Sequence, residues 1–413
     1  MIKNDYGKLN TPIYEEKQKS GLNVILIPKD STLNTAILYI PQGFYLHDEE
    51  INNSKISFGC PFLLKEMILN DETKKRIEEE GCKVQAVCKH SYTYYKFESL
   101  SKLAASINIL LNRIRNLQLS DEEVERYKKI IMSKNVYDDV LLAKDNVLKN
   151  LFINSPMKKG SEIKNSDLVK IHLTEMKKFL YKYYSIKSMT LFVSGNYTPT
   201  AVINDIRRLE FPVFPITSSK ELKFNEDYSN VCEKRDVLYL DKTSNILSLG
   251  IKFLSRKELF EKYGELIFAF YEIVKNIIVE NDKFKTMLRE TDSKLLDFDI
   301  IEGYEDTSLI MTFSCVKFAS LSNRLSDFLS TLEKSISLKF YNKIRKDYVN
   351  RAKNILANPS LLIDNFARLY ADNLPYTYIV KKVSLLAKTD FIKILSGILS
   401  YPRSVTYLQQ KEE

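Results

Sequence analysis

Residues 59–69 constrain the fold of this chain more than any other segment. The apolar side chains recur at positions 60, 63, 64, 67 and 68, which is the spacing of a helix with one buried face. Pro61 suits the first turn of such a helix, where its missing N–H costs little. Phe62, Lys65 and Glu66 follow the i, i+3, i+4 pattern, so their side chains project together from a second face.

This segment, Gly-Cys-Pro-Phe-Leu-Leu-Lys-Glu-Met-Ile-Leu, resembles the inverted zinc motif H-x-x-E-H of the M16 (pitrilysin/insulinase) metallopeptidases in its usual setting G-L-A-H-F-L-E-H-M-L. The resemblance places Phe62 and Glu66 at the two zinc-binding histidines, and Lys65 at the general-base glutamate. It implies that the helix is kept and the metal site is lost. The alternative is an ordinary core helix in an unrelated α+β protein.

The third zinc ligand of the family is a glutamate on a later helix. A helix is predicted to begin at Ser120, with acidic residues in its first turn, and to run toward residues 137–139. The segment resembles the family pattern E-x-x-x-I-x-x-E-I-x-x-x-x-D. Counting back from residues 137–139 places the third ligand position at Ser133, so the resemblance implies that this ligand is absent too.

The segments 22–28 and 35–40 are predicted to form two strands joined by a turn at residues 30–32. This opening resembles the first hairpin of an M16 half. Residues 82–88 alternate like a strand with one covered face, and residues 92–98 are the predicted antiparallel return strand.

In the family, the position of residues 82–88 holds an edge strand to which the peptide substrate adds by backbone pairing. The resemblance therefore implies substrate contacts at Val84, Gln85, Ala86 and Val87. The alternative is an ordinary hairpin that binds no ligand. An open edge must in either case be covered, because unpaired strands promote aggregation.

The length of 413 residues predicts two domains. Residues 210–235 contain prolines and serines that break any regular pattern, and after them the order of strands and helices repeats. Together with this repeat, the resemblance implies an α+β fold with two homologous α/β halves of the M16 type, each a mainly antiparallel sheet with helices on one face. The predicted domains are residues 1–209 and 236–413, joined by the linker at 210–235.

In the second half, residues 286–291 resemble the L-R-E-K segment of the family. Relatives that are active use this arginine, and a tyrosine seven residues later, to contact the substrate backbone and the developing oxyanion. Arg289 keeps the arginine, whereas Leu296 stands at the tyrosine position. Arg289 is accordingly a candidate substrate-binding residue, with an ordinary surface arginine as the alternative.

Histidine and cysteine usage offers no other site. His47, His90 and His172 are too far apart in sequence for a local histidine zinc site. No Ser-His-Asp or Cys-His arrangement is supported. The five cysteines, at positions 60, 82, 88, 232 and 315, are interpreted as reduced and mostly buried thiols of a cytoplasmic protein.

The formal charge of +9 is spread over lysine-rich amphipathic segments, which is typical of a solvated surface. We expect no nucleic-acid partner, since no recognition motif accompanies the charge. No apolar run reaches the length of a membrane span, and the first residues lack a signal core, so neither membrane association nor export is expected.

M16 peptidases of this length work as dimers that enclose a chamber, and bacterial pairs often combine a zinc-bearing chain with a zinc-free one. The resemblance implies that this chain is the zinc-free, non-catalytic subunit of M16B size. Its expected partners are a catalytic M16B subunit, which would hold the zinc, and a peptide substrate. This chain itself is expected to hold no cofactor. The alternative is a scaffolding protein without any peptidase role.

Overall fold

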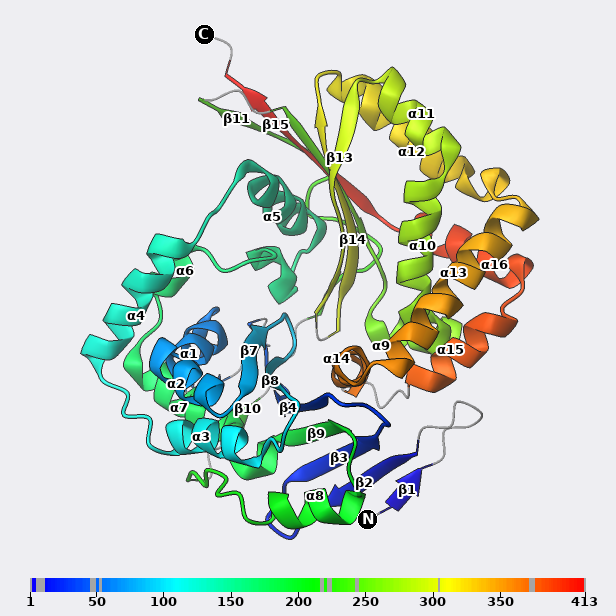
Figure 1. Ribbon diagram of the computed structural model, residues 1–413. Helices are drawn as coiled ribbons and strands as arrows, with labels where there is room; N and C mark the ends of the chain where they lie inside the picture. The colour runs from blue at the N-terminus through cyan, green and yellow to red at the C-terminus, as the bar shows by residue number, and fades with distance from the viewer. Residues whose placement is uncertain are drawn as a thin grey trace. The chain divides into compact units, whose positions relative to one another are not determined.

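The computed structural model (Figure 1) describes most of the chain. Its secondary structure mixes helices and strands throughout, in agreement with the predicted α+β class. His47 lies outside the described residues. The described ranges are 2–4, 12–44, 50–51, 54–215, 219–220, 225–241, 245–303, 305–370 and 376–411.

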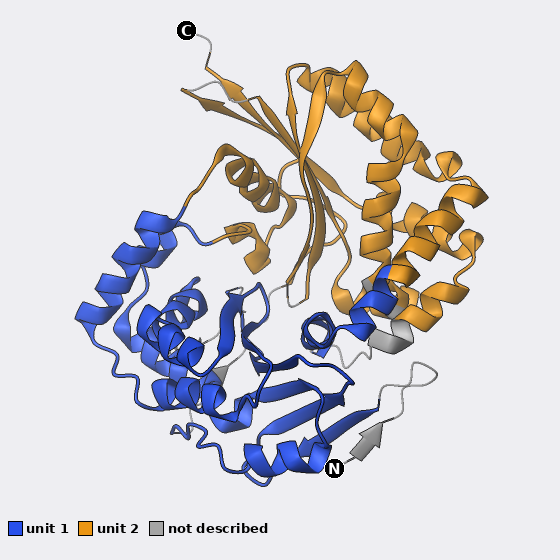
Figure 2. Cartoon of the chain, in the orientation of Figure 1, with its two compact units in different colours: residues 1–135, 163–222, 351–378 blue, residues 136–162, 223–350, 379–413 orange. Residues whose placement is uncertain are grey.

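The chain divides into two compact units (Figure 2). Unit 1 contains residues 1–135, 163–222 and 351–378, and unit 2 contains residues 136–162, 223–350 and 379–413. The units differ from the predicted continuous domains in two segments. Residues 136–162 come from the first half of the sequence but belong to unit 2, and residues 351–378 come from the second half but belong to unit 1. The predicted boundaries at 209 and 236 describe the order of elements along the chain and stay a prediction.

Unit 1 is built on a mixed sheet with strand order β1-β2-β3-β9-β4-β8-β7. β3 pairs with β9 in parallel, and the other pairs of this sheet are antiparallel. A small second sheet has the order β10-β5-β6. The strands are β1 (Ile2–Asn4), β2 (Ile13–Lys17), β3 (Asn23–Pro28), β4 (Asn34–Ile40), β5 (Glu50–Ile51), β6 (Ser54–Lys55), β7 (Cys82–Cys88), β8 (Thr93–Ser99), β9 (Thr190–Gly195) and β10 (Ser219–Lys220).

The predicted pairing of the first two strands is wrong, although both strands exist. β9 lies between β3 and β4 and pairs with both, so the turn at residues 30–32 does not close a hairpin. Every residue of β9 is buried, and such a strand needs a neighbour on each edge and cover on each face. The antiparallel hairpin of β7 and β8 is confirmed.

Both faces of the main sheet in unit 1 carry helices, not the single face that was predicted, because its central strands are buried on both sides. On one face, Tyr95 of β8 hydrogen bonds through its hydroxyl to Tyr184, which follows α7 (3.1 Å). On the other face, α14 packs on β4 and β9, where Tyr370 meets Tyr39 and Phe192 edge to face. The helices are α1 (Cys60–Ile68), α2 (Asp71–Glu79), α3 (Ala104–Arg115), α4 (Asp121–Lys134), α6 (Asn165–Val169), α7 (Leu173–Tyr183), η2 (Ile186–Ser188), α8 (Pro199–Ile206) and α14 (Pro359–Tyr370).

Unit 2 contains a sheet with strand order β11-β15-β12-β14-β13. Figure 1 shows α5 on one side of this sheet and α10 and α12 on the other. The strands are β11 (Arg235–Leu240), β12 (Ile246–Lys252), β13 (Ser293–Glu302), β14 (Thr307–Cys315) and β15 (Arg403–Gln410). The helices are α5 (Asp139–Leu151), η1 (Pro156–Lys159), α9 (Arg256–Tyr263), η3 (Gly264–Leu266), α10 (Ile267–Glu280), α11 (Asp282–Glu290), α12 (Phe318–Ser335) and α16 (Lys388–Leu399), while α13 (Leu338–Ala357) and α15 (Tyr376–Leu385) cross the boundary between the units.

The two main sheets share one topology. The order β3-β9-β4-β8-β7 corresponds to β11-β15-β12-β14-β13, with one parallel pair followed by antiparallel pairs in each. Each edge strand follows a helix that begins with Asn-Asp, and each turn between them has a residue at positive φ: Gly81 at 71° and Asp292 at 50°. The predicted repeat of element order is therefore confirmed.

Each sheet takes one covering helix from the other half of the sequence. α14 covers β4 and β9 in unit 1, and α5 covers β12 and β15 in unit 2. Gly250 allows the close approach of α5, because a Cβ there would lie 2.4 Å from Val147 Cγ1 and 2.6 Å from Leu151 Cδ1.

Part of the predicted linker is anchored in unit 2. The carboxylate of Glu226 accepts hydrogen bonds from the backbone N–H groups of residues 153–155 and from Lys252 Nζ (2.8 Å), and this ion pair is fully buried. Next to it, Asp306 accepts hydrogen bonds from the hydroxyls of Ser155 and Tyr228, each at 2.5 Å.

No helix among the described residues is both long and apolar enough to cross a membrane.

Candidate functional site

The helix predicted from residues 59–69 is α1, and its buried face is the predicted one. Gly59 precedes it at φ 95°, a conformation that favours glycine, and Pro61 lies in the first turn. Cys60, Leu63, Leu64, Met67 and Ile68 are all 0% exposed, which confirms the predicted apolar face. α1 contacts α7, α3, α4 and β7, so its second face lies near an edge strand.

Phe62, Lys65 and Glu66 form a local cluster on that second face. Lys65 Nζ lies 2.5 Å from Glu66 Oε1 and 4.4 Å from the centroid of the Phe62 ring. The Lys65 side chain is 9% exposed, whereas that of Glu66 is 39% exposed. Burial of the ammonium against a carboxylate and an aromatic face satisfies its charge. The three side chains therefore project together, as their spacing predicts, and form an ion pair and a cation–π contact.

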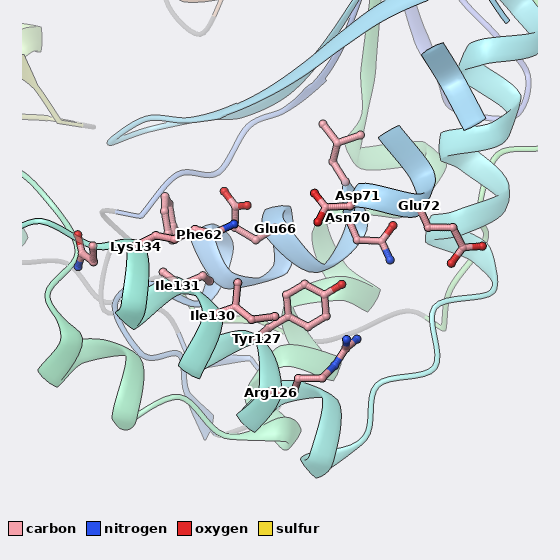
Figure 3. A pocket seen from close by; sticks show the side chains of 12 residues that line it. Phe62, Glu66, Asn70, Asp71, Glu72, Arg126, Tyr127, Ile130, Ile131 and Lys134 are labelled. Carbon is pink, nitrogen blue, oxygen red and sulfur yellow. The ribbon is translucent and has the colours of Figure 1, made fainter. Parts of the chain in front are cut away.

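A pocket of about 470 Å³ lies between α1, the start of α2, and α4 (Figure 3). Its apolar lining is contributed by both α1 and α4, and charged side chains stand around it. The lining residues from α1 and the turn into α2 are Phe62, Glu66, Leu69, Asn70, Asp71 and Glu72. Those from α4 and the residue after it are Arg126, Tyr127, Ile130, Ile131, Lys134 and Asn135.

Ser133, the predicted third ligand position, does not line this pocket. It is exposed, and its hydroxyl donates a hydrogen bond to the carbonyl of Ile130 (2.8 Å). Lys134 lines the pocket in its place. α4 begins as predicted, because Ser120 caps it by accepting a hydrogen bond from the N–H of Glu123. Ser133 therefore lies on the face of α4 next to the one that lines the pocket, and its match to the third ligand position stays a prediction.

The residues at the motif positions do not fit the zinc site of the family. A structural or catalytic zinc takes three or four ligands from Cys, His, Asp or Glu. Phe62 offers no donor atom, and the Lys65 ammonium already neutralises Glu66. Lys134 brings a further cation to the pocket. We therefore assign no metal-dependent step to this chain.

β7 occupies the edge of the main sheet among the described strands of unit 1. It pairs with β8 in unbroken register from Cys82 to Cys88, and no described strand pairs with its outer edge. Val84 is buried, Gln85 is exposed, and Ala86 and Val87 are half-buried. The position of the strand agrees with that expected from the resemblance, and its binding of a peptide stays a prediction.

Arg289 lies near the end of α11 in unit 2, with its side chain exposed to solvent. Its guanidinium donates a hydrogen bond to the hydroxyl of Thr286 on the same helix (3.1 Å). Leu296, at the tyrosine position of the family, is 41% exposed and lies in a β-bulge of β13. The structure therefore places Arg289 on a surface, where its role in binding stays a prediction.

The cysteines are thiols in the structure, and no disulfide links them. Cys60, Cys82 and Cys315 are buried, Cys88 is half-buried and Cys232 is exposed. Burial raises the pKa of the Cys60 and Cys82 thiols, and it raises the pKa of Cys315 to about 12. These three thiols are therefore unreactive at neutral pH.

The α4 wall of the pocket is not among the site residues predicted from the sequence. Tyr127, Ile130, Ile131 and Lys134 follow the i, i+3, i+4, i+7 pattern of a single helix face. That spacing was available from the sequence. Ser133, the position that the resemblance indicated, lies on the neighbouring face.

No protein-family model matches this chain, and a curated protein resembles it in sequence. The relative is YmfH of Bacillus subtilis (strain 168), described as an uncharacterized zinc protease. It is 23% identical over 294 residues, which are 67% of this chain. The match spans 66% of that relative, slightly less than two-thirds of its length.

Solved structures resemble the chain over nearly its whole length. A putative M16-like peptidase from Alicyclobacillus acidocaldarius has a TM-score of 0.81 at 14% identity, over 98% of this chain and 99% of that one. A peptidase M16 inactive domain from Pseudomonas fluorescens has a TM-score of 0.75 at 11% identity, over 97% and 98%. The periplasmic protease PqqL from Escherichia coli has a TM-score of 0.70 at 13% identity, over 97% of this chain and 48% of that one.

These likenesses agree with the topology of the two sheets. Two related α+β halves, each with a sheet and packed helices, match the M16-like structures from end to end. At such low identity, the agreement concerns the fold and not the activity. This chain has the two-part α+β fold of the M16-like peptidases, as its resemblance over residues 59–69 predicted.

Proposed function

We propose that this chain is the non-catalytic subunit of a cytoplasmic, heterodimeric M16B zinc peptidase that cleaves unfolded or leader peptides. The observation that carries the proposal is the retained α1 with Phe62, Lys65 and Glu66 at the metal and base positions. An M16 domain described as inactive shares the fold, so the architecture is compatible with a chain that does no chemistry itself. The zinc would be held by a partner with an intact H-x-x-E-H motif.

The contribution of this chain would be to bind the peptide and to wall the chamber. Val84, Gln85, Ala86 and Val87 would pair with an extended peptide through the outer edge of β7. Arg289 would add a charged hydrogen bond to the peptide backbone. PqqL supports a two-part assembly, since this chain matches only 48% of that longer protein. Two chains of the present length would supply a comparable amount of structure.

The test is reconstitution with the M16 chain of the same organism that keeps the intact motif. The pair should cleave an unfolded peptide, and zinc should be found with the partner. Each chain alone should be inactive or nearly so. Failure of the two chains to associate, or equal cleavage by the partner alone, would refute the proposal.

A scaffolding role is the second candidate, and the surroundings of Arg289 favour it. Its guanidinium is bonded to Thr286 of its own helix, and the family tyrosine is replaced by the exposed Leu296. Isolation of the chain from its native cell distinguishes the two. A second M16 chain should accompany it if the first proposal holds, whereas a stable complex without any peptidase would favour the scaffold.

A further inference from the structure

The pocket between α1 and α4 carries opposite charges at its two ends. Figure 3 shows Lys134 near Phe62 at one end, and Asp71 and Glu72 at the other. Lys134, Asp71 and Glu72 form no ion pair with any residue that the structure describes. All three are exposed, so a ligand in the pocket can reach them.

The middle of the pocket is apolar and close to neutral. Tyr127, Ile130 and Ile131 form its floor between the two ends, and Ile130 remains 36% exposed. Glu66 is neutralised by Lys65 at 2.5 Å. Arg126 is likewise engaged, because its guanidinium lies 2.9 Å from the carboxylate of Glu123. The charges that remain available are therefore those at the ends.

We infer that this pocket binds a short peptide with free termini and a large apolar side chain. The α-ammonium would lie toward Asp71 and Glu72, the α-carboxylate toward Lys134, and the side chain on the floor made by Ile130 and Ile131. Both termini of a free peptide are charged at neutral pH, whereas an internal segment of a longer chain lacks these charges. The volume of about 470 Å³ is within the usual range for small-ligand pockets.

This inference rests on the proposed function, because a short peptide with two free ends is what a peptidase complex releases. Charge complementarity sets the orientation of such a ligand more than its affinity. The helical role of Asp71 and Glu72, which stabilise the first turn of α2, is compatible with binding. The cavity, the exposed Ile130 in its apolar floor and the opposite charge of Lys134 are independent of that role.

The experiment measures binding of the tripeptide Ala-Phe-Ala to the isolated full chain by titration calorimetry. Parallel titrations use the N-acetylated form, the C-amidated form and the form blocked at both ends. Because the contacts are solvent-exposed, blocking each end should weaken binding roughly two- to fivefold. Lys134→Glu should abolish the preference for a free carboxylate. The double change Asp71→Asn and Glu72→Gln should abolish the preference for a free ammonium.

Lys129→Glu is the matched control, since Lys129 is an exposed lysine of α4 that does not line the pocket. It should leave the preference for free ends unchanged. Equal affinity for the free and doubly blocked tripeptides would overturn the inference, and so would the absence of binding. The assay needs no partner subunit, so its failure is distinct from failure of the reconstituted pair to cleave.

Discussion

Lys65 is the residue at which this chain differs most from the chemistry of the peptidases it resembles. The resemblance over residues 59–69 places Lys65 at the general-base carboxylate of the family, and the structure has there a buried ammonium that pairs with Glu66 and faces the Phe62 ring. One cation and one carboxylate thus lie together on the second face of α1. Loss of the partner costs more free energy for a buried cation than for a half-exposed carboxylate, because water can solvate the carboxylate.

The two single substitutions in this ion pair should therefore lower the free energy of unfolding by different amounts. Glu66→Ala should lower the free energy of unfolding by about 1–3 kcal/mol, because the Lys65 ammonium would lose its carboxylate in a buried position. Lys65→Met should cost less, since Glu66 is half-exposed and water can solvate it. Urea unfolding measures both. Adding Lys65→Met to Glu66→Ala should recover stability, and a further loss would contradict the interpretation.

The same residues predict that the purified chain holds no stoichiometric zinc. Glu66 alone cannot supply a tetrahedral site, and Lys65 would place a cation beside the metal. Elemental analysis after dialysis checks this. The triple change Phe62→His, Lys65→Glu and Glu66→His should not create peptide hydrolysis, because the α4 wall offers Lys134 and no carboxylate ligand. One zinc per chain that is lost in Glu66→Ala would end this account.

The relative placement of side chains could be predicted from the sequence where they lie on one helix. The cluster of Phe62, Lys65 and Glu66 follows from their spacing alone. The third ligand position depended on a count from residues 137–139, which lie beyond the end of α4. A shift of one residue changes the helix face, and Lys134 lines the pocket whereas Ser133 does not.

At the scale of elements, the strands were predictable and part of their pairing was not. Alternation and composition identified the positions of β3, β4, β7 and β8. β7 and β8 pair across a short turn, as local sequence suggests. β9 enters between β3 and β4 from more than a hundred residues away, and no local signal announces such an insertion.

Gly250 should be intolerant of any side chain, because α5 lies directly against it. Gly250→Ala should lower the free energy of unfolding by about 1–3 kcal/mol through overpacking, although alanine is otherwise the better residue in a strand. Thermal or urea unfolding measures the loss. Val147→Ala in the same molecule removes the nearest atom, so the double variant should lose less than the sum of the two single changes.

The buried carboxyl of Asp306, next to Glu226 in unit 2, should make the free energy of unfolding depend on pH. Burial, with the nearby charges of Glu226 and Glu305, raises the pKa of Asp306 to about 6, although hydrogen bonds from Ser155 and Tyr228 act in the opposite direction. A carboxyl with a raised folded-state pKa contributes stability that is complete below its ordinary value, near 4, and is lost as the pH rises through 6. The loss is at most about 3 kcal/mol.

Asp306→Asn should remove this dependence, as seen by urea unfolding between pH 4 and pH 7. The variant must be compared with the unaltered chain, because the titration of Glu226 changes the free energy of unfolding with pH in the opposite direction to that of Asp306. Burial acts to raise its pKa, but hydrogen bonds from residues 153–155 and Lys252 lower it, so its contribution is lost as the pH falls. A difference between the two chains that does not change over this range would contradict the role of Asp306.

At the scale of the whole molecule, the prediction concerns Arg289 in the reconstituted pair. If it binds the peptide, its charged hydrogen bond is worth about 1.5–3 kcal/mol, and Arg289→Ala should slow cleavage roughly ten- to a hundredfold. Assembly, followed by sedimentation, should not change. Arg289→Lys should rescue activity only partly because the planar fork is lost.

Arg324→Ala is the matched control for Arg289. Arg324 is a half-exposed arginine of α12 that pairs with Glu290 of α11. Its loss should leave cleavage nearly unchanged. Full activity with Arg289→Ala would show that this chain walls the chamber and does not contact the peptide.

The repeated halves could be predicted from the order of elements, and the exchange of α5 and α14 could not. An amphipathic helix shows that it covers a surface, but its pattern does not say which sheet supplies that surface. α5 lies in the first half of the sequence and covers β12 and β15, and α14 lies in the second half and covers β4 and β9.

This exchange also governs the order in which the protein can be completed during synthesis. The strands of the first sheet leave the ribosome long before Tyr370, which covers Tyr39 and Phe192, has been made. α5, made early, must in turn wait for β12 and β15. Until then, apolar and aromatic surface that would promote aggregation stays open to solvent. The nascent chain is therefore prone to aggregation throughout its elongation. Each unit is complete only after residues from the second half of the sequence have emerged from the ribosome.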